Sequence, residues 1–383
     1  MPDPANTTFL RRCYEKLQWA YRCLRFGAAV QPDETVVLFP QCAAQKPGGG
    51  WIVPLHAWVV ELETGSLSRR LGHRALFELL GLSGVTESEK NSPLFGKRLD
   101  WFMADREMNK RLRLQIDDQI HSSPRSPPSG HIKFSVEYHG AAPAGSIIEY
   151  RVVDAANREE PVPRVSGQIQ LVPVRGLSVI SDIDDTIKTS HVTDKKELVR
   201  GIFFDDYKPV SGMPELYQQM AERDVCFHYV SSSPWQIFPS LAPLLRKYYP
   251  AGSISLRHFY IASRSFIDFF RHSRRYKTQA ISSLLERYPQ RKFILIGDSG
   301  EKDPEIYCEI CNRFVDQVKA ILIRQVPVAD NDSPHAKENQ ALRWQGLKQS
   351  LPQPDCFRVF ESPRELSDFI VSVIDTENAA MSI

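Results

Sequence analysis

The chain has 383 residues, of which 42% are hydrophobic, and its 48 basic and 46 acidic side chains leave a formal net charge of +2. This near balance excludes a polycation that binds by bulk charge, so nucleic acid is not the expected partner. Seven scattered cysteines, an odd number at low density, favour a reducing compartment. No run of 18 apolar residues is present, and the first residues lack the order of a secretion signal. We therefore expect a cytoplasmic protein without a transmembrane segment and with room for two domains.

Residues 1–29 are expected to contain a basic amphipathic helix. Apolar side chains recur every three or four positions, at Leu10, Tyr14, Leu17, Tyr21, Leu24 and Ala28. The basic side chains lie off this stripe, against a single acidic residue, Glu15. Such a helix can lie on an anionic membrane, or it can dock on its own domain with its basic face in water, which is the favoured alternative.

Residues 30–175 predict a β-rich N-terminal domain. Runs rich in β-branched and aromatic residues are bounded by proline and glycine, which is typical of strands. The strand candidates are residues 35–39, 51–63, 131–139, 147–153 and 166–174. Residues 71–82 predict a short helix, and residues 86–130 form an insertion.

Residues 176–383 have a different pattern, in which strand candidates alternate with helix candidates. The strand candidates are residues 177–181, 225–230, 254–261, 292–297, 319–324 and 357–360. The helix candidates are residues 213–223, 235–248, 276–287, 304–312 and 363–376. This alternation predicts an α/β fold, with a parallel, Rossmann-like sheet and helices on both faces. Ligands of such sheets bind beyond the carboxyl ends of the strands.

Polar residues stand at these strand ends. They are Asp182, Asp184, Asp185 and Thr186 after the first strand, Ser231, Ser232 and Ser233 after the second, Asp298 and Asp303 after the fourth, and Lys277 at the start of a helix. Adjacent carboxylates repel one another when they are desolvated, so this cluster favours a bound divalent cation such as Mg²⁺, which would bridge a nucleophile and a phosphoryl oxygen. A helix N-terminus and a lysine can bind phosphate. One carboxylate can attack phosphorus while its neighbour two residues on acts as general acid and then base.

Each of these motifs has an ordinary structural explanation when it is taken alone. An Asp-x-Asp pair is common in surface loops, a serine can cap a helix, and a lysine is usually solvated. Their order along the chain, each at or beside the end of a strand, favours a site for phosphoryl transfer.

The motif set resembles that of the haloacid-dehalogenase superfamily of phosphotransferases. Residues 182–186 match its Asp-x-Asp-x-Thr motif, Ser231 its second motif, Lys277 its third, and Asp298 through Asp303 its fourth. Longer stretches resemble the phosphatidate phosphatases of the actin-patch-protein type, and they lie at residues 178–188, 209–217, 228–236 and 294–307. Residues 53–63 look like a degenerate form of that family's N-terminal strand.

This resemblance implies a role for each motif residue. Asp182 would be the nucleophile that forms a phospho-aspartate, and Asp184 would be the general acid and base. The phosphate-binding residues would be Thr186, Ser231, Ser232 and Lys277. The Mg²⁺ ligands would be Asp182, Asp184 through its backbone carbonyl, Asp298 and, in support, Asp303.

The chain leaves little room for the cap domain that often covers the site in this superfamily. Residues 188–224 are too few for an independently folded cap, so we expect an open site, which suits a lipid or a protein substrate. Residues 257–277 mix basic and aromatic side chains. That mixture suits an anionic bilayer, single-stranded nucleic acid, or a solvated helix face over core aromatics.

The function implied by the resemblance is Mg²⁺-dependent hydrolysis of phosphatidate to diacylglycerol and phosphate, at a membrane surface to which the protein binds peripherally. The chain would thus be a phosphoric monoester hydrolase. Two alternatives stay open. A phosphatase of the same chemistry could act on phosphoproteins or nucleic-acid ends, or the fold could be retained by a non-catalytic lipid-binding protein.

Overall fold

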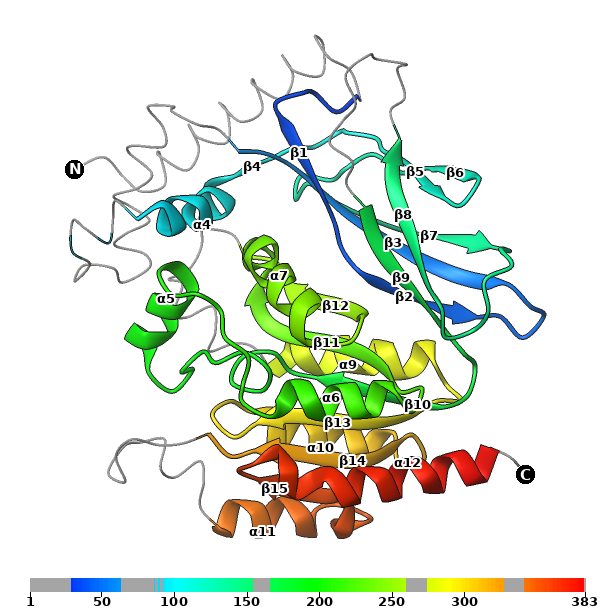
Figure 1. Ribbon diagram of the computed structural model, residues 1–383, viewed down its shortest axis with the longest axis vertical. Helices are drawn as coiled ribbons and strands as arrows, with labels where there is room; N and C mark the ends of the chain where they lie inside the picture. Colours follow the sequence, from blue (N-terminus) through cyan, green and yellow to red (C-terminus); the bar gives the residue numbers. More distant parts are fainter. Residues whose placement is uncertain are drawn as a thin grey trace.

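The computed structural model describes residues 29–62, 86, 89, 92–153, 166–259, 274–326 and 341–381. The helices predicted at residues 9–28 and 71–82, and most of the basic and aromatic segment 257–277, lie outside these ranges. Figure 1 shows a β-rich part packed against an α/β part. Among the described residues, no helix has the length and apolar character that crossing a bilayer requires.

Six parallel strands form the sheet of the α/β part, in the order β12-β11-β10-β13-β14-β15. Their bounds are β10 Leu177–Ser181, β11 Cys226–Pro234, β12 Gly252–Arg257, β13 Lys292–Asp298, β14 Val318–Arg324 and β15 Phe357–Phe360. Numbered along the chain, this is the 3-2-1-4-5-6 order of the doubly wound fold. The order reverses between β10 and β13, and a ligand site is expected at the carboxyl ends of these two strands.

Helices cover both faces of this sheet because its strands are apolar on both sides. Ile294 and Ile296 of β13 belong to one buried cluster, whereas Phe293 and Leu295 belong to another. The first cluster includes side chains of α6 Met213–Ala221, α7 Phe238–Tyr248 and α12 Ser367–Met381. The second includes side chains of α9 Arg274–Arg287 and α10 Asp303–Arg313, and α11 Ala341–Gln349 packs against it. The predicted α/β class is therefore confirmed.

The β-rich part is a nine-stranded sheet in which β3 pairs with four other strands. Its strands are β1 Glu34–Leu38, β2 Gln41–Gln45, β3 Trp51–Glu61, β4 Asp105–Arg106, β5 Arg113–Ile116, β6 Gln119–Ser122, β7 His131–Tyr138, β8 Ile147–Val153 and β9 Ser166–Val172. Helix α4, Pro93–Met103, lies between β3 and β4 in the sequence. The predicted β-rich character of this part is confirmed.

Two elements of the α/β part carry no prediction above. Helix α5, Lys195–Phe203, follows the first motif and packs against α4 from the insertion. Helix α11 buries none of its residues fully, so a pattern of buried positions could not identify it. Short 3₁₀ turns also occur, namely η1 Trp235–Ile237, η3 Pro354–Cys356 and η4 Pro363–Leu366.

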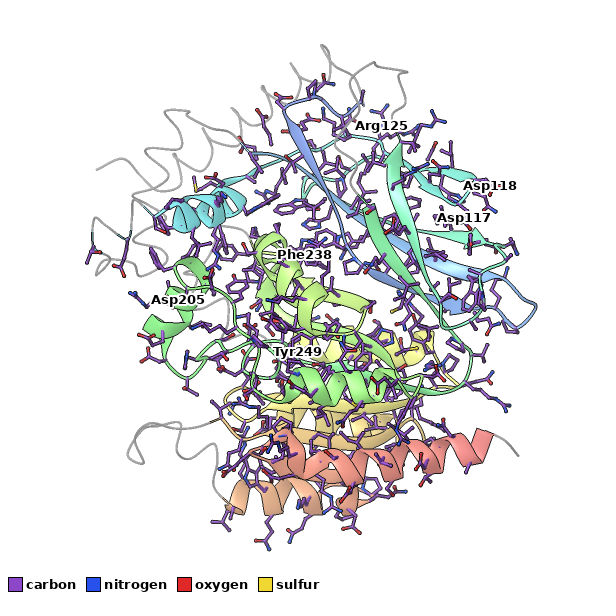
Figure 2. All side chains as sticks on the ribbon, viewed as in Figure 1. Asp117, Asp118, Arg125, Asp205, Phe238 and Tyr249 are labelled. Carbon is purple, nitrogen blue, oxygen red and sulfur yellow. The ribbon has the colours of Figure 1, made fainter. Side chains whose placement is uncertain are left out.

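The two sheets share one aromatic core. Phe39 and Trp58 of the β-rich part belong to the same buried cluster as Trp235 and Phe238 of the α/β part. The Phe39 ring centroid lies 4.5 Å from that of Trp235 and 4.8 Å from that of Phe238, which lies at this boundary (Figure 2). The β-rich part and the α/β part therefore share a continuous hydrophobic core.

The chain passes between the parts at a segment held by Arg291. The guanidinium is buried and donates to the carbonyls of Pro173, Arg175 and Leu177 and to the Oγ of Ser178. These hydrogen bonds fix the backbone at the start of β10, the strand that leads directly to the aspartate cluster.

Candidate active site

The motif residues gather at the carboxyl ends of the central strands. Asp182 directly follows β10, and Asp298 is the last residue of β13, so both lie where the strand order reverses. Asp303 begins α10, and Lys277 lies in the first turn of α9. Four residues from three segments that are distant in sequence thus meet at the place that the topology favours for a ligand.

The serines reach the site from a strand. Ser231, Ser232 and Ser233 lie inside β11, and the first helical turn begins only at Trp235. Pairing between β11 and β12 is interrupted between Val230 and Pro234, and such irregularities redirect side chains. The start of the first helical turn at Trp235 agrees with the helix predicted at residues 235–248, whereas the serines themselves belong to the strand.

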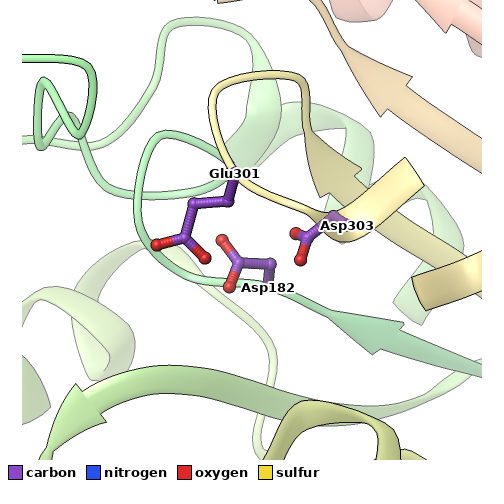
Figure 3. A group of neighbouring side chains, drawn as sticks. All are labelled: Asp182, Glu301 and Asp303. Carbon is purple, nitrogen blue, oxygen red and sulfur yellow. The ribbon is translucent and has the colours of Figure 1, made fainter. Parts of the chain in front are cut away.

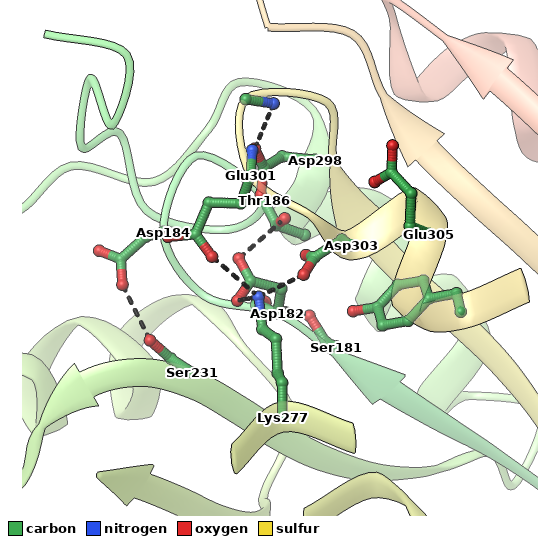
Figure 4. Close-up of polar contacts among 12 residues, drawn as sticks. Ser181, Asp182, Asp184, Thr186, Ser231, Lys277, Asp298, Glu301, Asp303 and Glu305 are labelled. Carbon is green, nitrogen blue, oxygen red and sulfur yellow. Dashed lines mark hydrogen bonds and ion pairs between the residues drawn. The ribbon is translucent and has the colours of Figure 1, made fainter. Parts of the chain in front are cut away.

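Lys277 joins three carboxylates at the centre of the site (Figure 4). Its Nζ lies 2.6 Å from Oδ1 of Asp182 and 3.2 Å from Oε2 of Glu301, and it also contacts Oδ1 of Asp303. Thr186 donates through Oγ1 to Oδ2 of Asp182 at 3.2 Å. The Asp182 residue is 1% exposed and Lys277 is fully buried. A buried ammonium and several carboxylates therefore share one site.

Asp182, Glu301 and Asp303 form an acidic cluster that could hold a metal ion (Figure 3). One carboxylate oxygen of each lies within 4.8 Å of the others. Glu301 carries no role in the sequence analysis, although it stands inside the loop between Asp298 and Asp303. The carboxylate of Asp184 is not part of this group.

Asp298 lies beside this cluster and keeps one oxygen unused. Its Oδ1 accepts from the backbone N–H groups of Gly300 at 2.7 Å and Glu301 at 3.0 Å. Its Oδ2, like Oδ2 of Asp303, is buried and has no hydrogen-bond partner among the described residues. Buried oxygens of this kind fit a hard cation, which coordinates carboxylates.

The electrostatics of the cluster also favour a cation. Burial raises the pKa of Asp182 well above its ordinary range; the Lys277 charge opposes this shift, and the charges of Asp303 and Glu301 add to it. Burial and the neighbouring carboxylates of Asp303 and Asp182 likewise raise the pKa of Asp298. One ammonium cannot compensate four carboxylates, so a divalent cation would stabilise their ionised forms.

Asp184 lies beside the acidic cluster and has its own set of polar side-chain partners. Its Oδ2 accepts from Ser231 at 2.9 Å and from Ser233 at 2.7 Å. Its Oδ1 accepts from Ser190 at 2.8 Å and lies 2.9 Å from Nζ of Lys188. Burial alone would raise the pKa of Asp184, but the Lys188 charge and these hydrogen bonds lower it below its ordinary value. Figure 4 shows the Asp184 carboxylate turned toward Ser231, whereas that of Asp182 faces Lys277.

Asp185 shapes the loop that carries the motif. It is buried, has a φ of 53°, and its carboxylate accepts from the N–H groups of Ser190, His191 and Val192. Arg324, at the end of β14, donates to the Asp185 carbonyl at 2.7 Å. These contacts fix the backbone between Asp184 and Lys188, so Asp185 organises the loop and does not face solvent.

The site is closed in this structure, which differs from the open site that the short insertions predict. Asp184 is 4% exposed, Ser231 1% and Ser232 2%. The hydroxyl of Ser232 has no hydrogen-bond partner among the described residues. Side chains or segments around Asp182 must therefore move before a phosphate ester can reach it.

Residues 177–325 match the family model of the catalytic domain of phosphatidate phosphatase APP1. The chain is 37% identical over 167 residues to phosphatidate phosphatase APP1 of Saccharomyces cerevisiae, covering 43% of this chain and 28% of the yeast protein. It is 28% identical over 240 residues to the uncharacterized protein C29B5.04c of Schizosaccharomyces pombe, covering 61% of this chain and 38% of that protein. The aligned part of this chain thus spans less than half the length of either relative.

Two solved structures align with part of this chain at low similarity. A HAD family hydrolase from Deinococcus radiodurans R1, with bound phosphate and sodium, aligns with 51% of this chain and 95% of its own at 12% identity and a TM-score of 0.27. DsGPDH of Dunaliella salina aligns with 45% of this chain and 28% of its own at 19% identity and a TM-score of 0.26. At these scores the likeness carries no argument about activity. By sequence, residues 177–325 are similar to the catalytic domain of phosphatidate phosphatase APP1.

Proposed function

We propose that the protein is a Mg²⁺-dependent phosphatidate phosphatase that releases phosphate through a phospho-aspartate intermediate. The observation that carries this proposal is the buried meeting of Asp182, Lys277 and Asp303 at the reversal point of the sheet. The matched family model over residues 177–325 supports the substrate class.

The residues present fit a magnesium ion. We propose Asp182, Asp298, Glu301 and Asp303 as the side chains that would hold it, with the Asp184 carbonyl as a further oxygen ligand. The crowding of these carboxylates and the unused oxygens of Asp298 and Asp303 support this assignment. When bound, the ion would neutralise charge on the nucleophile and on the phosphoryl oxygens.

Asp182 is proposed to attack the phosphorus atom, so that an Asp182 oxygen–phosphorus bond forms as the bond from phosphorus to the glycerol oxygen breaks. The negative charge of a bound phosphate ester would favour protonation of Asp184 against the effect of Lys188, and the protonated Asp184 then gives its proton to the departing glycerol oxygen. In the second step Asp184 takes a proton from water, and the resulting hydroxide displaces phosphate from Asp182. Lys277, Thr186 and Ser231 lie where they could hold the phosphoryl oxygens during both steps, and Ser232 adds a buried hydroxyl beside them.

A phospholipid at a membrane surface is the proposed substrate. The described residues contain no membrane-spanning helix, so this proposal has the protein meet the lipid from the water side. Because the site side chains are buried, headgroup entry would require the enclosure to open at the surface.

The test is release of phosphate from phosphatidate presented in detergent micelles of defined composition. We expect release with Mg²⁺, loss with excess EDTA, and loss on the order of 10⁴-fold or more for Asp182→Asn, because the nucleophile is gone. A beryllofluoride adduct on Asp182 would report the same nucleophile without turnover.

A substrate panel at equal Mg²⁺ separates the alternatives. A phosphopeptide and a 5′-phosphorylated oligonucleotide should be poor substrates beside phosphatidate. Activity that is unchanged in Asp182→Asn would contradict the mechanism. Tight binding to phosphatidate vesicles with no phosphate release under any condition would favour the non-catalytic alternative.

A further inference from the structure

A buried cation without an assigned role lies behind Asp184. Lys188 is 1% exposed, its Nζ lies 2.9 Å from Oδ1 of Asp184, and it also donates to Oγ of Ser190. The same ammonium lies 4.9 Å from the centroid of the Tyr207 ring. The Lys188 ammonium therefore interacts with the Asp184 carboxylate and with the face of the Tyr207 ring.

The Tyr207 ring is itself held by the N-terminal insertion. The Arg98 guanidinium of α4 lies 4.3 Å from the centroid of the same ring. Arg98 is 5% exposed and donates to the carbonyls of Gly201, Ile202 and Asp205, which closes the end of α5. A chain of contacts thus runs from α4 through Arg98, Tyr207 and Lys188 to Asp184.

Aromatic packing keeps α4 and α5 together around this chain. The ring of Phe95 stacks on Phe204 at 4.7 Å between centroids, and Phe102 lies 4.9 Å from Phe203. Arg98 stands between Phe95 and Phe102 on the same helix, so its position is set on both sides.

The two oxygens of Asp184 have different partners. Oδ1 is held by Lys188 and Ser190, whereas Oδ2 is held by Ser231 and Ser233. Ser231 is also one of the proposed phosphate ligands. When its hydroxyl turns to a phosphoryl oxygen, Oδ2 loses a partner and becomes available to the leaving oxygen, while Oδ1 stays in place.

We propose that Lys188 is a positioning residue that holds Asp184 for proton transfer, and that Tyr207 and Arg98 hold Lys188. This inference rests on the proposed phosphatase function and extends it to the N-terminal insertion. A purely structural role is the alternative. It predicts an effect on stability alone, and a buried ion pair is weak evidence even for that.

The test compares Lys188→Met with the wild-type chain in steady-state hydrolysis of phosphatidate. We expect kcat to fall on the order of 10²-fold, the scale of general acid–base catalysis, while KM changes less than about threefold. Tyr207→Leu should lower kcat about tenfold, and Tyr207→Phe, which keeps the ring face, should stay near wild type.

A pair of small substrates reports the proton transfer directly. Phenyl phosphate and 4-nitrophenyl phosphate have nearly the same shape. Phenolate is the poorer leaving group, so its departure depends more strongly on protonation of the leaving oxygen. In single-turnover release, Lys188→Met should slow phenol release at least about tenfold more than nitrophenol release. An equal loss on both substrates would overturn the positioning role.

Lys110→Met is the matched control, because Lys110 is also buried and pairs with one carboxylate, Glu34, in the β-rich part. It should change stability and leave kcat alone. If Lys188→Met fails to fold, the Tyr207→Leu and Tyr207→Phe pair carries the test, and equal kcat in these two overturns the inference. A wild-type chain that cleaves none of the three phosphate esters contradicts the proposed function itself, whereas an active wild type with unchanged kcat in the variants contradicts only the role of Lys188.

Discussion

His56 and His131 are hydrogen-bonded ring to ring inside the protein, with Nε2 of His56 2.9 Å from Nδ1 of His131. Both rings are buried, and the His131 ring stacks on Trp58 at 5.0 Å between centroids. They stand against Trp235, so this pair forms part of the contact between the two sheets.

We predict that these histidines lower the free energy of unfolding as the pH falls below about 6.5. Burial lowers the pKa of His56 well below its ordinary value and that of His131 to about 2. The unfolded chain takes up protons below about pH 6.5 and the native state does not, so each histidine removes about 1.4 kcal/mol of stability per pH unit below that value. Urea unfolding at pH 7.5, 6.5 and 5.5 measures this slope.

The control for this prediction is the exposed His139. His131→Gln should flatten the dependence of stability on pH, whereas His139→Gln should leave it as it is in the wild type. Equal slopes for His131→Gln and the wild type would show that acid acts elsewhere.

Gly176→Ala should destabilise the link between the sheets. Gly176 has a φ of 120°, and a Cβ there would lie 2.9 Å from Nη1 of Arg291, which is tied to four partners. We expect a loss of about 1–3 kcal/mol, seen as a lower urea midpoint. Gly346→Ala, in helix α11 with open space around it, should be neutral or slightly stabilising. Equal midpoints for the two variants would contradict this account.

Asp298→Asn should stabilise the metal-free protein. Burial first, and then the charges of Asp303 and Asp182, raise the pKa of Asp298, so its ionised form costs native stability as pH rises above the unfolded pKa near 4. In EDTA we expect a gain on the order of 1–2 kcal/mol that is larger at pH 8 than at pH 5. Differential scanning calorimetry with the exposed Asp316→Asn as control measures it, and a lower Tm at pH 8 would refute the prediction.

Glu301→Gln should weaken the response to magnesium. Glu301 shares the acidic cluster with Asp182 and Asp303, and loss of one ligand charge should raise the Mg²⁺ concentration for half-maximal phosphate release by about 10- to 100-fold. Glu305→Gln is the control, since Glu305, in the first turn of α10, pairs with Arg343 of α11. The same magnesium dependence in both variants would place the ion elsewhere.

The sequence was informative where chemistry and periodicity coincide. Buried strands such as β10 and β13 are continuous apolar runs, and their carboxyl ends mark the site because parallel strands share one edge. The positions of Asp182, Asp298 and Lys277 could thus be expected to converge. Glu301 could have been noticed as a third acid in the same loop, but loop geometry decides which acids face inward.

The partners of Asp184 could not be predicted in this way. Lys188 lies four residues along a non-helical loop, and its inward direction depends on the hydrogen bonds that Asp185 makes with three backbone N–H groups. Arg98 reaches the same place from a helix about 90 residues earlier in the chain. No local pattern encodes such a meeting, because it depends on tertiary packing.

The aromatic interior that Phe39 and Trp58 share with Trp235 and Phe238 has a consequence for where this protein can be divided. The matched family model starts at residue 177, yet a polypeptide trimmed to that point would expose the rings of Trp235 and Phe238 to water. The region that the family model covers is therefore smaller than the region expected to unfold cooperatively. Proteolysis during partial denaturation should release no persistent fragment that starts near residue 177.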